Sequence, residues 1–459
     1  MSYSETIEYI YNLQKHGIKF GLNNITRLVS ILGNPHKSFY SVHVAGTNGK
    51  GSTSALIASI LKVSGFKVGL FTSPHLVSFT ERIKVNDEEI TENEVVSLSE
   101  EIRSKVVDFS PTFFEVVTAL AFLYFQRKGI DIAVIEVGMG GRLDATNILI
   151  PEASVITSID YDHRGFLGDT IKEIAYEKAG IIKDDIPVVV SSQTLDVLKV
   201  IEVKARERNS EVYLYSRDFS AVLKRDDASG ICFDYFSDSF TIYDLYFPLA
   251  GEHQMQNASV GIKAVELINE RLLIPPRPPL QKGGMGGLGT QHLLPTTVES
   301  IRKGLSSVRW PGRLEMIKDD PPILIDGAHN PAAAVILSRA LVKNFLGIYK
   351  KIILILGIMG DKDIEGIMRP LLPIASEIIL TSPSYERAAP TAKLAGIAAS
   401  LGFPEVRVAP TLKDAIEMAK NSSLVIYHSS LIVITGSFYT IGEAKEVLGQ
   451  KGILSRLRE

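Results

Sequence analysis

The sequence predicts an α/β protein with two consecutive domains, a phosphate-loop domain followed by a smaller, Rossmann-like domain. Three observations support this prediction. Short apolar runs alternate with helical patterns along most of the chain, a glycine-rich segment with a lysine follows the first run, and a second strand–helix series begins near Ile323. A chain of 459 residues is also too long for one ordinary core, so two or more domains are expected.

The first domain is expected to contain a largely parallel sheet, because its predicted strands are apolar on both faces. The helix after the first strand carries apolar residues at helical spacing, and Gly65 provides a stop. An aromatic-rich alternation from Cys232 to Phe247, with a turn at residues 237–239, predicts an antiparallel hairpin. The parallel strands are expected at residues 41–45, 68–72, 132–137, 155–159 and 188–190.

The second domain repeats the strand-then-helix order, which implies a doubly wound sheet with right-handed crossovers. The sequence Trp310-Pro311-Gly312 marks a non-helical connection before it. We therefore expect a first domain at residues 1–308, a linker at 309–313 and a second domain at 314–459. Its strands are expected at residues 323–326, 352–356, 378–381, 406–409 and from 431, with helices at 332–345, 364–371, 392–401 and from 412.

Residues 275–297 concentrate prolines first and glycines next. The glycine run at 283–289 is unlike a second phosphate loop, because no strand precedes it and no amphipathic helix with a lysine follows it. We interpret this segment as a flexible surface insertion between two helices.

Composition narrows the class of protein. Hydrophobic residues make up 45% and charged residues 22% of the chain, as in soluble globular proteins. A net charge of −3 argues against a nucleic-acid or membrane-surface partner, which usually requires a basic excess. The single cysteine, Cys232, fits a reducing compartment, and no signal peptide or membrane-length apolar run is evident. We expect a cytoplasmic monomer that acts on small molecules.

The stretch VAGTNGKGSTSALI, Val44 to Ile57, departs from the usual phosphate-loop pattern G-x-x-x-x-G-K-[ST]. Val44 stands at the first glycine position, and Gly51 separates Lys50 from Ser52. Glycines let backbone N–H groups converge on phosphate oxygens, and a lysine there reaches the β- and γ-phosphates. A plain glycine turn is the alternative, but strand, loop, lysine and helix fall in register and favour a nucleotide site. Whether Ser52 or Thr53 contacts Mg²⁺ is left open.

Several polar residues follow predicted strands, where open α/β sheets place their sites. Glu136 ends an apolar strand and is either a Mg²⁺ ligand or a solvated strand end. Ser73 and His75 follow another strand, and His163 beside Asp160 and Asp162 is either a ligand or a loop hydrogen-bonder. The sequence G-M-G-G-R after Glu136 lacks the last glycine of a dinucleotide fingerprint. Taken alone, Lys178 near a helix end is interpreted as a partner of the helix dipole.

Seven blocks occur in the order found in one family: GTNGKGS (46–52), FTSPHL (71–76), EVGMGGRLDATN (136–147), DHRGFLGDT (162–170), EKAGI (177–181), PGRLE (311–315) and DGAHNP (326–331). Together they resemble the folylpolyglutamate synthase and dihydrofolate synthase family of the Mur ligase superfamily. The resemblance covers essentially the whole chain apart from 275–297. It implies a Mur-ligase-type ATP-binding domain in which this glycine loop is the ordinary form.

The resemblance also implies roles for individual residues. The cofactors would be ATP and Mg²⁺, with a monovalent cation as a further candidate, and Lys178 would be carbamylated, which turns a cation into an anion. Lys50, Lys178 and His329 are the candidate catalytic residues, Ser73, Glu136 and His163 the metal ligands, and Arg82, His329 and Ser437 the contacts to pterin and glutamate. The candidate ATP contacts are Gly46, Thr47, Asn48, Gly49, Lys50, Gly51, Ser52, Asn257, Arg313 and Asp326.

The implied reaction is ATP-dependent addition of L-glutamate to folate, and to dihydropteroate as well, through an acyl phosphate. Another Mur-type amino-acid ligase is the nearest alternative, although the 45 residues before Gly46 are too few for a nucleotide-sugar domain. A P-loop ATPase without a ligase product is a second alternative, but it would not require the DGAHNP and TGSFYT blocks. A non-enzymatic binding module fits least well with a loop lysine beside candidate metal ligands.

Overall fold

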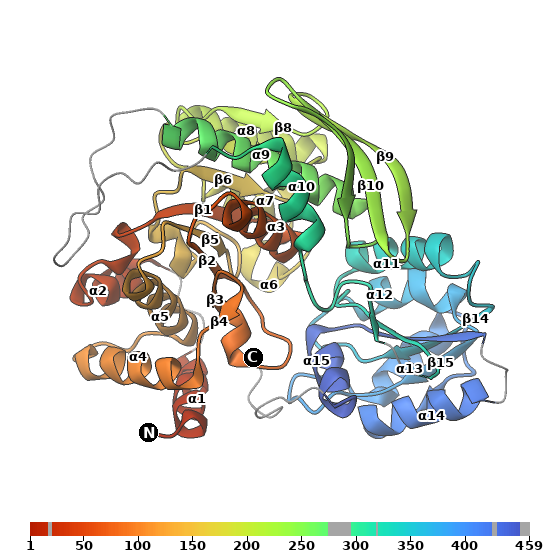
Figure 1. Cartoon of the computed structure of the whole chain (residues 1–459). Coiled ribbons are helices and arrows are strands. Elements are labelled where there is room, and N and C mark those ends of the chain that lie inside the picture. The colour runs from red at the N-terminus through yellow and green to blue at the C-terminus, as the bar shows by residue number, and fades with distance from the viewer. Residues whose placement is uncertain (17–20, 274–294, 318–319, 425–428, 450–459) are drawn as a thin grey trace.

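The computed structural model describes residues 1–16, 21–273, 295–317, 320–424 and 429–449, and these form two lobes (Figure 1). The N-terminal lobe contains the elements from α1 to α10, and the C-terminal lobe contains those from β12 to α15. Within the described residues no helix is long and apolar enough to cross a membrane.

The N-terminal lobe is built on an eight-stranded sheet with the order β4-β3-β2-β5-β1-β6-β7-β8. Its central strands are parallel, and β1 lies between β5 and β6. The antiparallel β3 and β4 extend one edge. The bounds are β1 Tyr40–Ala45, β2 Val68–Phe71, β3 Ile83–Val85, β4 Glu88–Glu89, β5 Ile132–Glu136, β6 Ala153–Ile156, β7 Val188–Val190 and β8 Val212–Leu214.

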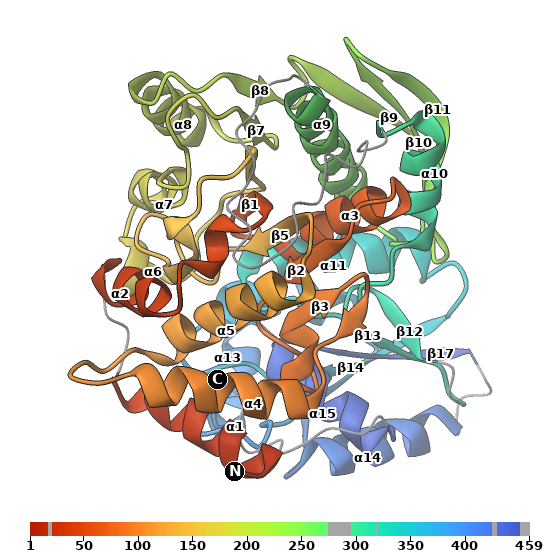
Figure 2. The same cartoon turned by 60° about the vertical axis from the view of Figure 1, so that its left-hand side comes forward.

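Helices cover both faces of this sheet because alternate strand residues point to opposite sides. In β5, Ile132 and Val134 pack with α3, α9 and α10, whereas Ala133 and Ile135 pack with α1, α2, α4 and α5. Figure 2 shows α1, α4 and α5 together on one side. The bounds are α1 Tyr3–Asn12, α2 Asn23–Ile31, α3 Lys50–Val63, α4 Glu92–Lys105, α5 Phe113–Lys128, α6 Arg164–Leu167, α7 Ile171–Ala179, α8 Leu195–Glu207, α9 His253–Leu273 and α10 Val298–Ser307.

A separate antiparallel sheet extends the N-terminal lobe toward the C-terminal lobe (Figure 1). It has the order β11-β10-β9, with β9 Phe219–Asp227, β10 Gly230–Ser237 and β11 Thr241–Phe247. The predicted hairpin is confirmed as β10–β11, and β9 is an added strand. Asp226 in β9 accepts a hydrogen bond from Asn344 Nδ2 (2.9 Å) and pairs with Lys343 Nζ (3.0 Å), both on α11.

The C-terminal lobe has a six-stranded sheet with the order β12-β13-β17-β14-β15-β16, parallel except for β12. The predicted strand–helix series is therefore confirmed. Its strands are β12 Glu315–Ile317, β13 Ile323–Ile325, β14 Lys351–Leu356, β15 Glu377–Leu380, β16 Arg407–Val408 and β17 Ser430–Thr435. Its helices are α11 Pro331–Asn344, α12 Ile364–Leu371, α13 Thr391–Ser400, α14 Leu412–Leu424 and α15 Phe438–Val447.

Two sequence predictions need comment. The stretch 73–87, for which no strand was expected, includes β3, which pairs antiparallel with β2 in the main sheet and has Ile83 and Val85 buried. The insertion at 275–297 lies outside the described residues except for its last three, of which Thr297 caps α10.

Candidate functional site

A cavity of about 870 Å³ lies between the two lobes. The carboxyl ends of β1, β2, β5 and β6 contribute to one wall, as expected for an open parallel sheet. Trp310, Arg313 and His329 come from the connection and from the C-terminal lobe, together with the aromatic Phe438 and Tyr439. The cavity is therefore bounded by both lobes.

The glycine loop connects β1 to α3, and its shape requires glycine. Gly49 has a φ of +90°, and a Cβ atom there would collide with the Asn257 side chain. The loop folds back on itself, since Lys50 Nζ donates to the carbonyl oxygens of Gly46 (3.2 Å) and Thr47 (3.3 Å). Lys50 lines the cavity, so its ammonium group is available to an anionic ligand there.

Lys178 reaches the same loop from α7. It is buried, and its Nζ donates to the Gly46 carbonyl oxygen at 2.8 Å. Burial, with a smaller contribution from repulsion by Lys50, lowers the pKa of Lys178 to about 7. A substantial fraction of this amine is therefore uncharged near neutral pH, which is the form that can act as a nucleophile.

Glu136 ends β5 beneath the loop, and its Oε2 accepts the backbone N–H of Ser73 at 3.1 Å. Burial raises the pKa of Glu136 to about 6, although Lys50, the Ser73 N–H, Arg313 and Arg82 oppose this rise. Glu136 and Ser73 line the cavity, as does His163. Burial lowers the pKa of His163 to about 4, so its imidazole is neutral at physiological pH and able to act as a ligand.

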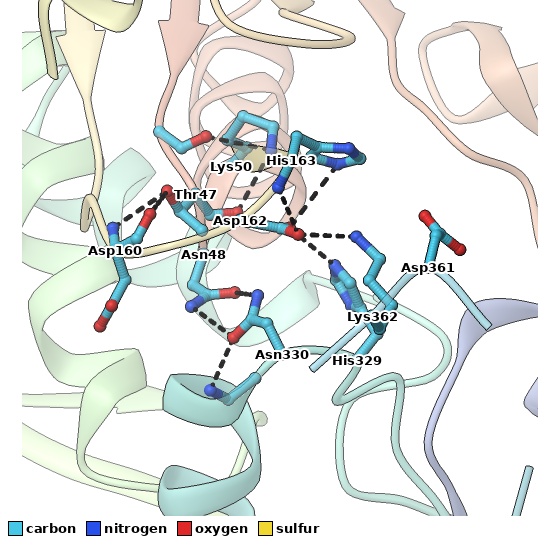
Figure 3. A network of polar contacts seen from close by, with 12 residues as sticks. Thr47, Asn48, Lys50, Asp160, Asp162, His163, His329, Asn330, Asp361 and Lys362 are labelled. Atoms are coloured by element: carbon cyan, nitrogen blue, oxygen red, sulfur yellow. Dashed lines mark hydrogen bonds and ion pairs between the residues drawn. The ribbon is translucent and has the colours of Figure 1, made fainter. Parts of the chain in front are cut away.

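Asp162 links the two lobes at the cavity (Figure 3). Its carboxylate contacts Lys362 Nζ at 2.6 Å and His329 Nε2 at 3.5 Å, and both partners belong to the C-terminal lobe. His163 is a third neighbour, at 3.6 Å. Burial alone would raise the pKa of Asp162, but the hydrogen bond with His329 and the nearby positive charges hold it well below its ordinary value. Asp162 is thus an anion that pairs across the seam.

Arg313 and His329 lie against one aromatic ring. The guanidinium carbon of Arg313 is 4.9 Å from the centre of the Phe438 ring, and the His329 ring is also 4.9 Å from it. His329 Nδ1 donates to the Gly327 carbonyl oxygen at 2.8 Å. The predicted Arg313 and His329 are therefore brought together with Gly46, Thr47, Gly49, Lys50 and Gly51 around one cavity.

Other predicted ligand residues do not line this cavity in the described structure. Asp326 is buried, and its carboxylate accepts the backbone N–H groups of Leu314 (3.0 Å) and Ala328 (2.9 Å). Burial raises the pKa of Asp326, while the charge of Arg313 lowers it. Ser52 and Asn257 are buried beside the loop, and Asn257 Nδ2 donates to Gln254 at 3.0 Å. Asn48 directs its side chain to Asn330 on the other lobe.

Arg82 and Ser437 have structural partners. Arg82 is buried, its Nε donates to His75 Nδ1 at 2.9 Å, and its guanidinium lies 5.6 Å from the centre of the Phe113 ring. Phe113 lines the cavity, so Arg82 supports that wall from behind. Ser437 caps α15, and its Oγ accepts the Thr440 N–H at 3.0 Å. Their direct contacts with substrate stay predictions.

Sequence reasoning missed three residues at the seam: Asn330, Lys362 and Glu81. Asn330 stands before Pro331, and a helix-capping asparagine followed by proline was a readable signal. Lys362 belongs to a charged segment directly after β14, a position that often carries function. Glu81 accepts the N–H groups of Leu76 (2.8 Å), Val77 (2.8 Å) and Ser78 (2.7 Å), and only the fold reveals this.

This combination of a phosphate loop and a second α/β lobe around one cavity is matched by the Mur ligases. The family described as Mur ligase middle domain matches residues 44–265, and the one described as Mur ligase, glutamate ligase domain matches residues 312–438. The two matched regions thus include residues from both walls of the cavity.

Relatives narrow the class further. Folylpolyglutamate synthase of Lacticaseibacillus casei is 35% identical over 456 residues, covering 98% of this chain and 99% of the relative. Dihydrofolate synthase/folylpolyglutamate synthase of Bacillus subtilis is 33% identical over 467 residues, covering 97% and 99%. A structure of Mycobacterium tuberculosis folylpolyglutamate synthase complexed with ADP aligns with a TM-score of 0.87 at 31% identity, covering 98% of this chain and 100% of that one. The chain belongs to the folylpolyglutamate and dihydrofolate synthase family, and it is an ATP-dependent ligase.

Proposed function

We propose that this chain adds L-glutamate to the carboxyl group of folate at the expense of ATP, through an acyl-phosphate intermediate. The observation that carries the proposal is the shared cavity, where Lys50 on the phosphate loop faces Arg313 and His329 on the opposite wall. A ligase must hold a nucleotide, an acid and an amine together, and a cavity of about 870 Å³ between two lobes suits this task.

The chemistry explains the need for ATP. A carboxylate is a poor acylating agent because oxide would have to leave. Attack of a carboxylate oxygen on the γ-phosphorus breaks the bond to ADP and gives an acyl phosphate. The α-amine of glutamate then attacks the carbonyl carbon, and the tetrahedral intermediate expels phosphate and loses a proton to give the amide. Lys50 stabilises the negative charge that accumulates where the carboxylate meets the γ-phosphate.

The second lobe protects the intermediate. Water would hydrolyse an acyl phosphate, so the step needs a closed site. The contacts of Asp162 with Lys362 and His329 hold the lobes together beside Lys50. We assign to this closure the exclusion of water and the delivery of glutamate near His329.

Mg²⁺ fits the donors beneath the loop. Glu136 and Ser73 supply oxygen, His163 supplies a neutral nitrogen, and Mg²⁺ takes few protein ligands because water and substrate phosphates complete its shell. Among the described residues no group of three or more His, Cys, Asp or Glu side chains is placed to hold a metal. When bound, Mg²⁺ neutralises phosphate charge, and the protein's part is to hold Glu136 and Ser73 in place. A monovalent cation nearby stays a prediction.

Lys178 is proposed to be carbamylated. Its neutral amine nitrogen would attack the carbon of CO₂ and lose a proton to give a carbamate. The pKa of Lys178, lowered by burial to about 7, favours this step. Mass spectrometry under native conditions with ¹³C-bicarbonate, or a ¹³C resonance lost in Lys178→Met, tests it. An unmodified and fully active Lys178 would contradict the assignment.

Finer assignments follow from the family. We propose that Asn257 and Asp326 support the nucleotide, His329 and Ser437 handle glutamate, and Arg82 supports the pterin. We also propose activity on dihydropteroate, a monomeric enzyme in the cytoplasm, and domain boundaries at residues 308 and 314 around the linker.

One assay tests both the ligase activity and the acid substrate that the enzyme accepts. Purified enzyme receives ATP, Mg²⁺ and labelled glutamate with either dihydropteroate or tetrahydrofolate. We expect label in the products of both tetrahydrofolate and dihydropteroate, and label in the tetrahydrofolate product alone would contradict the proposed activity on dihydropteroate. ATP hydrolysis that needs neither acid nor glutamate would instead support the P-loop ATPase.

A further inference from the structure

Two asparagine side chains form a reciprocal amide pair across the seam (Figure 3). Asn330 Nδ2 donates to Asn48 Oδ1 at 3.0 Å, and Asn48 Nδ2 donates to Asn330 Oδ1 at 3.3 Å. Asn48 lies in the phosphate loop and Asn330 lies in the C-terminal lobe, 282 residues apart in the chain. The pair is thus a direct hydrogen-bonded link between the loop and the opposite lobe.

On the loop side, Asn48 lies two residues before Lys50. The backbone N–H groups of Thr47 (2.8 Å) and Asn48 (3.2 Å) both donate to the Ser158 carbonyl oxygen after β6. The backbone of the loop is therefore tied to the N-terminal lobe, whereas the Asn48 side chain is used on the other lobe. The loop conformation responds to both attachments.

On the opposite side, Asn330 has little freedom to move. It is 2% exposed and caps α11, because its Oδ1 accepts the Ala333 N–H at 2.9 Å. Pro331 follows it at the first position of the helix. Because the Asn330 side chain is held by the helix that it caps, it moves together with α11. A shift of α11 would therefore act on Asn48, which is the residue that Asn330 contacts across the seam.

A second interlobe link is found in the same region. Lys362 Nζ contacts Asp162 Oδ1 at 2.6 Å, and Lys362 is only 12% exposed. Two interlobe contacts, one to the glycine loop and one to the segment after β6, are thus found in the region of Lys50 (Figure 3). Docking of the C-terminal lobe constrains both segments that surround the loop lysine.

We propose that Asn330 is a positioning residue for phosphoryl transfer: through Asn48 it holds the phosphate loop in its reactive shape only while the lobes are docked. The inference rests on the ligase activity proposed above, and it adds that docking of the lobes is coupled to phosphoryl transfer. Phosphorylation of the acid then occurs only when water is already excluded, so each ATP consumed yields one amide bond.

The test uses Asn330→Ser in the full-length enzyme. Serine also caps helices and carries no charge, but it lacks the amide donor and the reach to Asn48. We expect kcat to fall on the order of tenfold, the loss expected for one buried hydrogen bond. KM for ATP should stay within about threefold, because the loop itself is intact. ADP formed per amide bond should rise above one as the acyl phosphate is hydrolysed.

Three controls distinguish a positioning role of Asn330 from a purely structural role. Asn421→Ser changes an exposed asparagine of α14 in the same lobe and should leave kcat and the ADP ratio unchanged. Asn330→Asp keeps the cap if the serine variant folds poorly. In a double-mutant cycle, Asn48→Ser combined with Asn330→Ser should cost no more than one of them alone, since the pair acts as a unit.

Wild-type kcat and an ADP ratio of one in Asn330→Ser, or additive losses in the cycle, would overturn the proposal. If the wild-type enzyme forms no amide bond, the proposed function fails but the docking role is still measurable. Small-angle X-ray scattering with a β,γ-methylene ATP analogue should then give a larger radius of gyration for Asn330→Ser than for wild type. Equal radii would overturn the positioning role by itself.

Discussion

The cationic side chains on the two walls of the cavity have different kinds of partner. On the N-terminal wall, Lys50 and Lys178 both donate to uncharged carbonyl oxygens of the glycine loop. On the C-terminal wall, three cations are paired with carboxylates, Lys362 with Asp162, Lys445 with Glu315 and Arg387 with Asp361, whereas Arg313 lies over the Phe438 ring. The first wall thus keeps the Lys50 cation for a ligand, and the second wall uses most of its cations to hold the protein together.

This difference assigns separate tasks to the two lobes. Unpaired buried charge is expensive, and burial lowers the pKa of Lys178 to about 7 as a result. Lys178 is therefore left partly neutral, and Lys50 is the cation that suits the N-terminal wall to ATP. The paired cations of the C-terminal wall add little net charge, and they fix the position of the lobe.

The largest expected effect comes from the N-terminal wall. Lys50→Ala should abolish ligation, by a factor on the order of 10³ or more, because it removes charge stabilisation from the phosphoryl-transfer transition state. Initial rates of glutamate incorporation measure it. Lys62→Ala, at the exposed end of the same helix, should keep full activity. Wild-type turnover by Lys50→Ala would remove the distinction between the walls.

Glu136→Gln should lower activity on the order of 10²-fold while stabilising the ligand-free enzyme. Burial raises the pKa of Glu136 from its ordinary 4.5 to about 6, so the folded protein binds a proton there that the unfolded chain does not. The stability from that proton is fully present below pH 4.5 and is lost as pH rises through about 6. At pH 8 the neutral glutamine should therefore raise the unfolding free energy by about 1–2 kcal/mol.

Urea unfolding at pH 5 and pH 8 measures this change, and the gain should shrink at the lower pH. Glu177→Gln, which removes a partly exposed carboxylate from α7, is the control for a generic charge effect. If Glu136→Gln raised the unfolding free energy equally at both values of pH, the increase would not come from burial of an ionised Glu136.

Lys445→Met breaks an ion pair of the C-terminal wall and should act mainly on stability. Lys445 is buried and holds Glu315 at 2.8 Å, while Glu315 also accepts the Gly312 N–H at 2.7 Å in the connection between the lobes. We expect a loss of about 1–3 kcal/mol in unfolding free energy and a smaller loss of kcat than for Lys50→Ala. A full loss of turnover in a stably folded variant would place Lys445 among the ligand contacts instead.

The smallest effect is expected from Ser437→Ala. Loss of the α15 cap should cost about 1 kcal/mol of stability, and a displaced Phe438 should raise KM for glutamate more than it lowers kcat. Ser437→Thr retains the cap and should behave as wild type. An increase of KM for glutamate in both variants would instead indicate a direct contact with the amino acid.

Sequence reasoning located the backbone of this site more reliably than its side chains. Parallel strands end at one edge of a sheet, so Gly46, Ser73 and Glu136 could be expected together from the positions of their strands alone. The direction of a side chain depends on what docks against it. Asn48 lies in the predicted loop yet contacts Asn330, and Ser437 caps its own helix.

Contacts between the lobes were the least accessible to prediction. Asp162 and Lys362 lie 200 residues apart, and no periodicity or spacing relates them. Asn330 could be recognised as a cap before proline, but its partner is defined only by the docking of α11 on the loop. The antiparallel strands β3 and β12 were also missed, because each is three residues long and includes a charged residue, Lys84 or Glu315, so neither presents an apolar run.

The central claim is that the seam activates a carboxylate with ATP. An isotope-transfer experiment tests it most directly, using folate labelled with ¹⁸O in the carboxylate that receives glutamate. We predict one ¹⁸O atom in the phosphate released for each amide bond formed, because a carboxylate oxygen attacks the γ-phosphorus. Released phosphate that carries no ¹⁸O, because its fourth oxygen comes from unlabelled water, would contradict the account and identify the seam as a site of ATP hydrolysis.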